Sequence, residues 1–232
     1  MYFNWNEDTI RWYINAEKHT GFYGRLAKDI SPMIQGYQTL CDLGCGAALF
    51  DFAIAPYIET IDCIDINKIA LSSVEDRAKQ NGLLNIHTHL ADCDTLSGEW
   101  DVVFMSFFGS RDLERYLLIC KKLIAVVASE SDTELFPRGE RSISRNTVEN
   151  TLEYLDNKGI AYMLTRRMYE FGQPFASRED AELFVQTYAP YTSSEEMSAF
   201  LDARLVQTGN NEFPIHIPRL KSVGIFELKC DL

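Results

Sequence analysis

The feature that most constrains this fold is a regular alternation, between residues 39 and 129, of short apolar runs with segments of helical spacing. Most of the apolar runs are continuous, which is typical of strands that are buried on both sides. Strands of this kind that alternate with helices predict a parallel sheet covered by helices on both faces. The apolar runs are 39–45, 60–66, 85–91, 100–108 and 123–129, and helical spacing occupies 48–58, 67–81 and 111–122.

The rest of the chain predicts further helices and two more strands. Residues 1–38 are rich in aromatic side chains and show no strand alternation, so we expect them to form a helical lid. A core domain then spans 39–232, with a helical insertion at about 174–212. The expected class is α/β, with a doubly wound, mostly parallel sheet. The remaining predicted elements are a charged loop at 130–145, a helix from Asn146 to Gly159, a strand at 160–171, a helix from near Ser177 to before Pro190, a helix from Ser193 to Gly209, and a last strand at 222–229.

Net charge and cysteine usage limit the partners and the compartment. The chain has 22 Lys and Arg against 34 Asp and Glu, a net charge of −12. Such a surface repels nucleic acid and anionic membranes, because both bind mainly through Lys and Arg. The cluster Arg138, Arg141 and Arg145 is the local exception. The six cysteines form no CxxC pair and four lie in apolar runs, which is typical of reduced cytoplasmic proteins.

No membrane span, secretion signal or metal site is expected from the sequence. No apolar run approaches the ~20 residues of a membrane helix, and the N-terminus lacks the basic and apolar segments of a secretory signal. Four cysteines, at 41, 45, 63 and 93, lack the paired spacing of zinc ligands. We therefore predict a cytoplasmic protein without a metal requirement.

The most informative stretch is the turn that joins the first strand to the first helix of the alternation, Asp42-Leu43-Gly44-Cys45-Gly46. Glycines in such a turn let the backbone approach a ligand closely. The following helix N-terminus adds exposed N–H groups. In open α/β sheets, ligands bind outside the carboxyl ends of the strands. This turn is therefore the first candidate for a binding site.

Two further carboxylates fall at the carboxyl ends of neighbouring strands. Asp65 ends the second strand, 19 positions after Gly46, where a carboxylate accepts hydrogen bonds from both hydroxyls of a ribose. Asp92 ends the third strand, where it can accept a bond from an adenine amine. The dinucleotide pattern G-x-G-x-x-G matches poorly, because Leu49 stands where Gly or Ala is needed. The pattern therefore favours a nucleoside cofactor other than a dinucleotide.

These residues together resemble the class I S-adenosylmethionine-dependent methyltransferase family. The resemblance rests on D-L-G-C-G-A-A at 42–48, on Asp65 in CIDIN, on Asp92 in LADC and on the W-D-V-V-F run, and it covers about residues 38–130. One departure is Ala48, where the family often has a third glycine. The family implies a Rossmann-like, seven-stranded sheet whose last strand is antiparallel, and S-adenosyl-L-methionine as the cofactor.

The resemblance also implies roles for individual residues. The loop from Asp42 through Gly44, Cys45 and Gly46 holds the amino-acid half of the cofactor. Asp65 holds the ribose, with Ile66 against the adenine. The adenine amine and ring lie beside Asp92 and Cys93, Ser106 lies between cofactor and acceptor, and Tyr23 reaches the cofactor carboxylate.

The acceptor and the base are less constrained. Histidine is the usual base for an alcohol or phenol, and His19 is our catalytic candidate because it lies among the lid aromatics; His216 is a second possibility, and His87 and His89 are expected to be structural. The fourth strand is followed by Ser-Phe-Phe-Gly at 106–109 and not by the Pro-Pro-Tyr type of motif of base-methylating enzymes. We therefore predict a small-molecule methyl acceptor. An acidic acceptor has candidates in Arg166, Arg167 and Arg178, and pocket-lining candidates are Tyr169, Phe171, Phe175 and Tyr188.

Three alternatives stay open at this point. Within the family, the acceptor is a protein or a nucleic acid reached through the Arg138–Arg145 loop. Outside it, the chain is a nicotinamide-dependent oxidoreductase, which the mismatch at Leu49 disfavours. A non-catalytic protein that keeps the cofactor fold is the third. The oligomeric state is not indicated by any pattern in the sequence.

Overall fold

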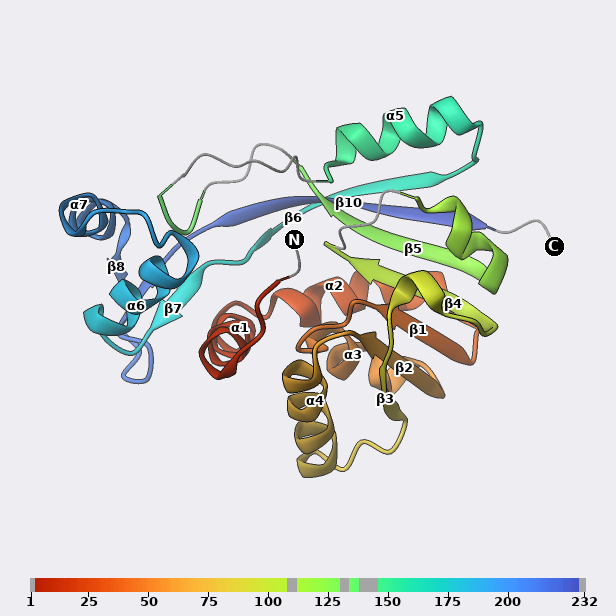
Figure 1. The fold of residues 1–232 in the computed structure, drawn as a ribbon, viewed down its shortest axis with the longest axis horizontal. Coiled ribbons are helices and arrows are strands. Elements are labelled where there is room, and N and C mark those ends of the chain that lie inside the picture. The colour runs from red at the N-terminus through yellow and green to blue at the C-terminus, as the bar shows by residue number, and fades with distance from the viewer. Residues whose placement is uncertain (1–2, 108–111, 130–133, 138–145, 230–232) are drawn as a thin grey trace.

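The computed structural model describes residues 3–107, 112–129, 134–137 and 146–229, and its centre is a seven-stranded sheet (Figure 1). Neighbouring strands follow the order β3-β2-β1-β4-β5-β10-β6. The first five of these pair in parallel, and β10 runs antiparallel to both β5 and β6. This confirms the doubly wound, mostly parallel sheet with an antiparallel last strand. The strands are β1 (Thr39–Leu43), β2 (Thr60–Asp65), β3 (Ile86–Leu90), β4 (Trp100–Ser106), β5 (Cys120–Ala128), β6 (Met163–Glu170) and β10 (Leu220–Lys229).

Helices cover both faces of this sheet, as Figure 1 shows, with α5 on one side and α2 and α3 on the other. Alternate residues of the strands point into two separate cores, because side chains along a strand alternate between its faces. One core includes Leu40, Val102 and Phe104, and the other Cys41, Val103 and Met105. The helices of the first core are α2 (Phe22–Ile30), α3 (Leu49–Ile54) and α4 (Lys68–Gln80), and those of the second are α5 (Val148–Lys158) and the 3-10 turn Glu114–Ile119.

The helix boundaries follow local capping chemistry. The Asn67 side chain accepts hydrogen bonds from the backbone N–H groups of Ile69 and Ala70 at 3.0 Å, which starts α4 where the sequence predicts. For α5, however, the N-cap is Thr147 and not Asn146, since the Thr147 hydroxyl accepts the Asn150 N–H. Gly159 ends that helix in a left-handed conformation, as expected.

Two predicted helices end differently in the structure. The expected helix 111–122 is in the described part only a short 3-10 turn, because the residues from Cys120 onward pair with β4 and extend β5 toward the N-terminus. The expected helix 193–209 is α7 (Ser194–Arg204), and Val206–Gln207 form a strand, β8. In both places ladder hydrogen bonds to another strand replace the local helical ones.

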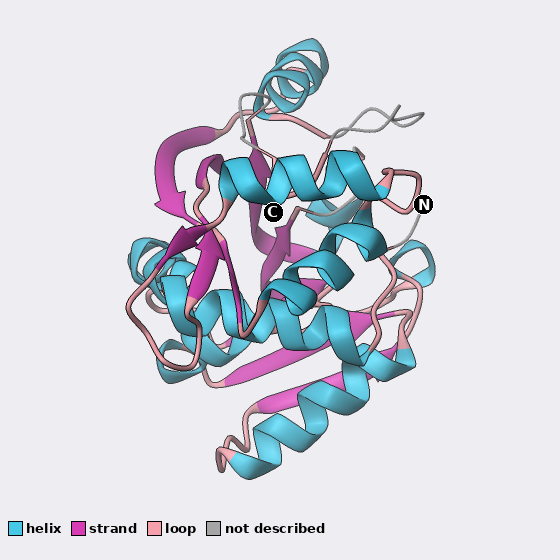
Figure 2. Cartoon of the chain, turned by 90° about the vertical axis from the view of Figure 1, so that its left-hand side faces the viewer, coloured by secondary structure: helices cyan, strands magenta, loops and turns pink. Residues whose placement is uncertain are grey.

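A second, three-stranded sheet lies beside the main one, and the sequence pattern did not indicate it. Its order is β7-β9-β8, and all of its pairs are antiparallel. Its apolar side packs against α1 (Glu7–Thr20), with Trp12, Phe175 and Phe184 in one buried cluster. The view in Figure 2 shows helices gathered around these short strands. The other elements here are β7 (Gln173–Phe175), α6 (Arg178–Tyr188), α7 and β9 (Ile215–Ile217).

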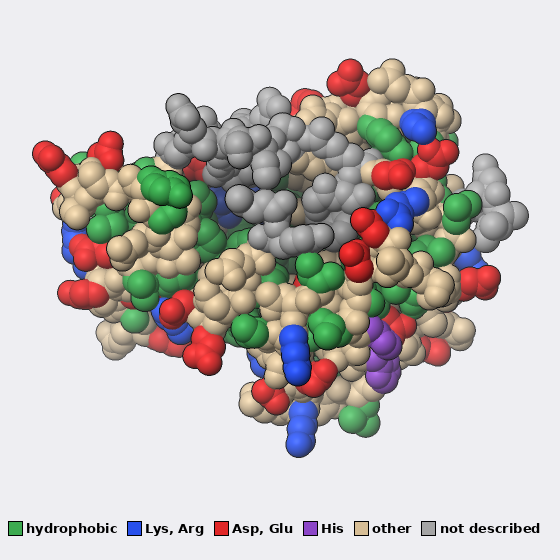
Figure 3. Space-filling model, in the orientation of Figure 1, with side chains coloured by type: hydrophobic (Ala, Val, Ile, Leu, Met, Phe, Trp, Pro, Cys, Tyr) green, Lys and Arg blue, Asp and Glu red, His purple; other side chains and the backbone are tan. Residues whose placement is uncertain are grey.

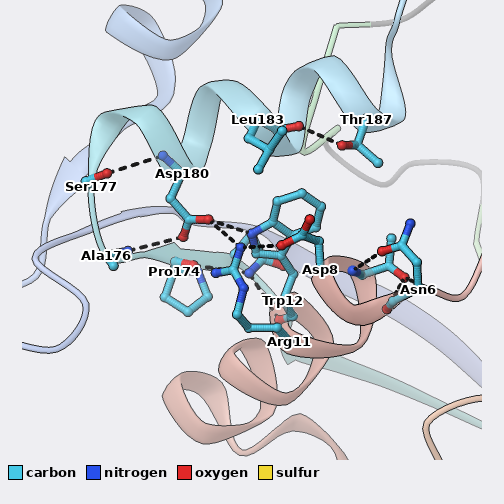
Figure 4. A network of polar contacts seen from close by, with 12 residues as sticks. Asn6, Asp8, Arg11, Trp12, Pro174, Ala176, Ser177, Asp180, Leu183 and Thr187 are labelled. Carbon is cyan, nitrogen blue, oxygen red and sulfur yellow. Dashed lines mark hydrogen bonds and ion pairs between the residues drawn. The ribbon is translucent and has the colours of Figure 1, made fainter. Parts of the chain in front are cut away.

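Polar contacts join α1 to the start of α6 (Figure 4). The indole N–H of Trp12 donates to Asp180 Oδ1 at 2.9 Å, and Arg11 Nη2 donates to the same oxygen at 2.8 Å. The Gln173 side chain donates to the Trp12 carbonyl at 3.1 Å. The N-terminal helix is therefore fastened to the segment that follows β6, more than 160 residues away in the chain.

Candidate active site

The glycine turn after β1 folds back onto the end of β2. The N–H groups of Gly44 and Cys45 both donate to the Ile64 carbonyl, at 2.8 and 3.1 Å, and the Gly46 N–H donates to Asp65 Oδ2 at 2.9 Å. The glycine turn and Asp65 at the end of β2 therefore lie together, as their places at neighbouring strand ends predict. The hydrogen bond from the Gly46 N–H fixes the position of the Asp65 carboxylate relative to the turn.

Gly46 is required by both its backbone and its surroundings. Its φ is +54°, in the left-handed region that side chains disfavour. A Cβ at this position would lie 2.2 Å from the Trp5 indole, which packs directly over the turn. Ala48 also has a left-handed φ, of +52°. This explains why a glycine is favourable where this chain has Ala48.

Asp65 is a nearly buried carboxylate with two backbone partners. Its Oδ1 accepts the Asn67 N–H at 2.8 Å, while Oδ2 accepts Gly46, and 7% of the residue is exposed. Each carboxylate oxygen has a second lone pair, so further donors can bind. The next residue, Ile66, is 41% exposed although it is apolar. A polar and an apolar contact surface thus lie side by side at the end of β2.

The ends of the third and fourth strands bring further predicted residues to this edge. Asp92 is exposed and caps a short turn by accepting the Asp94 N–H at 2.9 Å. Cys93 is buried beside the Gly44 backbone, and burial raises the pKa of its thiol to about 11. Ser106 is the last residue of β4 and is half-buried. All three lie at the carboxyl edge of the sheet.

Aromatic residues of the N-terminal segment form one connected cluster over this edge. Trp5 contacts Tyr13 with ring centroids 5.0 Å apart, and Tyr13 contacts Phe171 at 5.9 Å. The Tyr23 ring lies 5.8 Å from Phe171. Burial, followed by the nearby charges of Tyr13 and Asp42, raises the pKa of Tyr23 well above its ordinary value. Tyr23 is therefore close to the strand that leads into the glycine turn.

Beyond β4 the cluster encloses a lysine. The Lys221 ammonium lies 3.3 Å from the centroid of the Phe107 ring, 5.1 Å from Phe171 and 5.9 Å from Phe22. Phe107 itself has a left-handed φ of +53°, which is uncommon for a bulky residue and is often found at functional sites. Lys221 is the second residue of the antiparallel strand β10, so its side chain reaches the same edge as Ser106.

Beneath the turn lie two buried carboxyl groups, Asp42 and Asp51. They are 2% and 0% exposed. Burial, together with the charge of Asp51, raises the pKa of Asp42 well above its ordinary range, and burial raises that of Asp51 to about 7. Arg77 is the nearby cation, and its guanidinium donates to the Ala47 carbonyl.

His19, the catalytic candidate, contacts the small sheet. Its ring lies 4.9 Å from that of His216 and 6.2 Å from Phe213. Burial, then the charge of His19, lowers the pKa of His216. Within the described residues, His19 makes no hydrogen bond or ring contact with the glycine turn, so its catalytic role stays a prediction. His89, expected to be structural, contacts Asp62 at 2.7 Å.

The arginines proposed for an acidic acceptor are engaged in ion pairs. Arg167 pairs with Asp29 at 3.0 Å, and Arg178 pairs with Asp202 at 2.6 Å. Arg166 lies 3.7 Å from Glu149. The cluster Arg138, Arg141 and Arg145 lies outside the described residues. The cation at the candidate site is instead Lys221.

A family model for a methyltransferase domain matches residues 40–130, the segment that contains the turn and the three acidic strand ends. This match agrees with the family resemblance of the glycine turn and the acidic strand ends. A domain of this kind catalyses methyl transfer, which is the activity that the resemblance implies. The site residues fit S-adenosylmethionine, the cofactor that the resemblance implies, since Asp42 Oδ1 is buried without a donor, Asp65 can accept more bonds, and Ile66 offers an exposed apolar face.

Several solved structures share the fold of this chain. A putative methyltransferase from Bacillus halodurans superimposes with a TM-score of 0.54 at 12% identity, covering 89% of this chain and 98% of its own. Magnesium protoporphyrin IX methyltransferase from Synechocystis, with bound S-adenosylmethionine, gives 0.51 at 10% identity and covers 96% and 86%. A putative RNA methyltransferase from Pyrococcus horikoshii gives 0.52 at 12%, covering 91% and 85%. No match was found among curated proteins.

Two searches of the described residues were negative. None of the helices there is long and apolar enough to cross a membrane. Within the same residues, no group of three or more His, Cys, Asp or Glu side chains is arranged to hold a metal ion.

Three residues at the site were missed by sequence reasoning. Trp5 could not be assigned to the site from the sequence, because its contact with Gly46 depends on how the N-terminal segment crosses the turn. Lys221 lies in the alternating last strand and resembles any surface lysine in sequence. Asp51 carried a usable signal, because it is a lone carboxylate in the apolar stretch LFDFAIA.

Proposed function

We propose that this enzyme transfers the methyl group of S-adenosylmethionine to a small organic acceptor. The observation that carries the proposal is the turn from Asp42 to Gly46 hydrogen-bonded to Asp65, inside a segment that matches a methyltransferase domain. The acidic chain supports a small acceptor over a nucleic acid. On the face in Figure 3, the coloured Lys and Arg side chains are interspersed with Asp and Glu and do not gather into one field. The cytoplasmic location inferred from the cysteines stays a prediction.

The cofactor roles follow from the positions of the strand ends. Asp65 accepts the ribose hydroxyls, and the exposed face of Ile66 packs on the adenine. Asp92 and Cys93 flank the adenine amine and ring. The amino-acid half lies against the turn at Gly44, Cys45 and Gly46, with Asp42 and Tyr23 as its neighbours. These assignments assume the binding mode that the family resemblance implies.

The acceptor region is the aromatic cluster at the ends of β4 and β10. Ser106 and Phe107 form its base, Phe171 and Phe22 its wall, and Lys221 its cation. Rings and an enclosed ammonium favour a flat, apolar acceptor that carries a negative or electron-rich group. The cofactor supplies the methyl group, and these side chains align the acceptor and exclude water. His19 remains the candidate base for a hydroxyl acceptor.

The N-terminal segment is proposed as the lid over this site. Trp5 already lies on the glycine turn, and α1 is held to α6 through Trp12. We therefore retain the division into a lid at residues 1–38 and a methyltransferase domain at 39–232. The insertion at about 174–212 provides the docking surface of α1.

Calorimetric titration tests the cofactor assignment. We expect S-adenosylmethionine and S-adenosylhomocysteine to bind with micromolar affinity and NAD not to bind. Replacing Asp65 with Ala should reduce that affinity by at least about 10-fold, since about 1.4 kcal/mol of ribose contact is then lost. Asp156→Asn, an exposed carboxylate on α5, is the matched control and should bind as wild type. Binding of NAD alone would refute the proposal.

Methyl transfer to a cell extract tests the acceptor class. Purified enzyme is incubated with the extract and S-adenosylmethionine labelled in the methyl group, and the extract is then separated into small molecules, protein and RNA. We expect label in the small-molecule fraction. Label in the RNA or the protein fraction would show that the acceptor is a macromolecule.

A further inference from the structure

The carboxyl pair under the glycine turn is not explained by a structural role. Asp42 comes from β1 and Asp51 from the first turn of α3, so they approach each other from opposite sides of the turn. In the described part of the chain, Asp42 Oδ1 and both oxygens of Asp51 are buried without a hydrogen-bond donor. Buried polar atoms without partners are rare and costly. If both side chains are ionised, these three oxygens have no hydrogen-bond donor.

The two carboxyl groups are close enough that each affects the pKa of the other. Two ionised carboxylates are both acceptors only, so no hydrogen bond forms between them. A single proton changes this, because the protonated group then donates to its neighbour, and only one negative charge stays buried. Like-charge carboxyl pairs in proteins share a proton for this reason. Burial raises the pKa of both groups, which agrees with this arrangement.

The positive charge near the pair is sufficient to balance one negative charge but not two. Arg77 is the cation beside Asp51; it is partly buried, donates to the Ser73 carbonyl at 3.2 Å and stacks on Phe52 at 4.5 Å. The neighbouring thiols are uncharged below about pH 8. The charged and titratable groups that face the pair are Cys41, Cys45, Cys63, Asp65, Tyr23 and Arg77.

We propose that Asp42 and Asp51 share one proton in the ligand-free protein, and that the ammonium group of the cofactor's amino-acid end displaces this proton when it binds. The inference rests on the proposed function, which puts that ammonium against the turn. The O–H bond of the carboxylic acid breaks, the proton leaves to the buffer, and the two carboxylates then face two cations, Arg77 and the ligand ammonium. Asp51 is thereby a positioning residue that acts through Asp42.

The proton itself is tested first, without ligand. Infrared spectra of the intact protein at neutral pH should show the carbonyl band of a buried carboxylic acid. The band should be lost in Asp51→Asn, because the amide then donates to an ionised Asp42. Asp76→Asn, which removes an exposed carboxylate on α4, should keep the band. Its absence from the wild-type spectrum would overturn the shared proton.

The displacement is tested by titration calorimetry in two buffers that differ in ionisation enthalpy. At about pH 6.5 the ligand amine is fully charged, since α-amino groups have pKa values of about 7.7–8.0. Binding of S-adenosylmethionine or S-adenosylhomocysteine should release on the order of one proton per ligand. 5′-Methylthioadenosine, which has no ammonium group, should release none. Asp51→Asn should release none with any ligand, and Asp76→Asn should behave as wild type.

The outcomes separate the two proposals. Equal binding heats in both buffers for S-adenosylhomocysteine would overturn the displacement and leave the proposed function standing. Equal proton release by 5′-methylthioadenosine would also overturn it, because the ammonium would then have no part. Failure of both sulfur compounds to bind would overturn the proposed function and with it the displacement, while the infrared band would still decide the shared proton. Because the comparison of ligands uses wild-type protein, it does not depend on the folding of Asp51→Asn.

Discussion

At the scale of single residues, Gly46 shows how a backbone requirement and a packing requirement meet. Its left-handed φ is a property of the turn, and the sequence pattern predicts such a turn from two glycines after a strand. The Trp5 indole, 41 residues away in the chain, lies over its Cα and separately requires that no Cβ be present. The two requirements have different energetic sources, so substitutions can distinguish them.

Gly46→Ala should destabilise the protein more than Gly82→Ala. Both glycines have left-handed φ values, +54° and +66°, so an alanine there should lower the free energy of unfolding of either variant by about 1–2 kcal/mol. Nothing lies within 4 Å of a Cβ at Gly82. At Gly46 the methyl group must displace Trp5, which adds a further ~1–3 kcal/mol of overpacking. Urea unfolding measures both, and a red shift of tryptophan emission in Gly46→Ala reports the displaced indole.

Equal free energies of unfolding for the two variants would show that Trp5 moves aside without cost. In that case the N-terminal segment is only loosely seated on the turn, and the lid proposal loses its structural support.

At the scale of elements, α1 is held by the small sheet and α6 more than by the main sheet. The contact is built from the buried Trp12 ring and the Asp180 carboxylate, which accepts from Trp12 and from Arg11. The two donors differ in burial. Trp12 is fully buried, whereas the Arg11 side chain is 41% exposed.

Trp12→Phe should therefore cost more than Arg11→Met. Loss of a buried hydrogen bond to a charged group costs about 1.5–3 kcal/mol, whereas an exposed ion pair contributes about 0–1 kcal/mol. Thermal unfolding at moderate salt measures both variants. Hydrogen exchange in α1 should rise in Trp12→Phe and stay near wild type in Arg11→Met. A larger effect for Arg11→Met would mean that the ion pair, and not the indole, fastens the helix.

At the scale of the whole molecule, the pair Asp42 and Asp51 couples stability to pH. Their folded pKa values lie above those of an unfolded chain, so between about pH 4 and pH 7 the folded state binds more protons than the unfolded state. The contribution of the pair to the free energy of unfolding therefore falls as the pH rises through this window. Other carboxylates with lowered pKa values, such as Asp101 and Asp180, contribute in the opposite direction.

A comparison with Asp51→Asn isolates the pair from those carboxylates. In this variant the pair cannot ionise a second time. Its free energy of unfolding should therefore increase relative to that of wild type as the pH rises from 5 to 8. Urea unfolding at several pH values measures the difference. A constant difference across the range would show that Asp51 does not change protonation near neutral pH.

The sequence by itself determined the class of the sheet and the position of the glycine turn. Apolar periodicity, caps such as Asn67 and the spacing from Gly46 to Asp65 are short-range properties, and they predict the alternation of strands and helices and the place of the turn. Only the tertiary structure decided that Trp5 covers Gly46, that Asp51 meets Asp42, that Lys221 lies among Phe22, Phe107 and Phe171, and that residues 173–217 contain a second sheet. These contacts join side chains on different elements. They depend on how the elements pack, which no local pattern in the chain specifies.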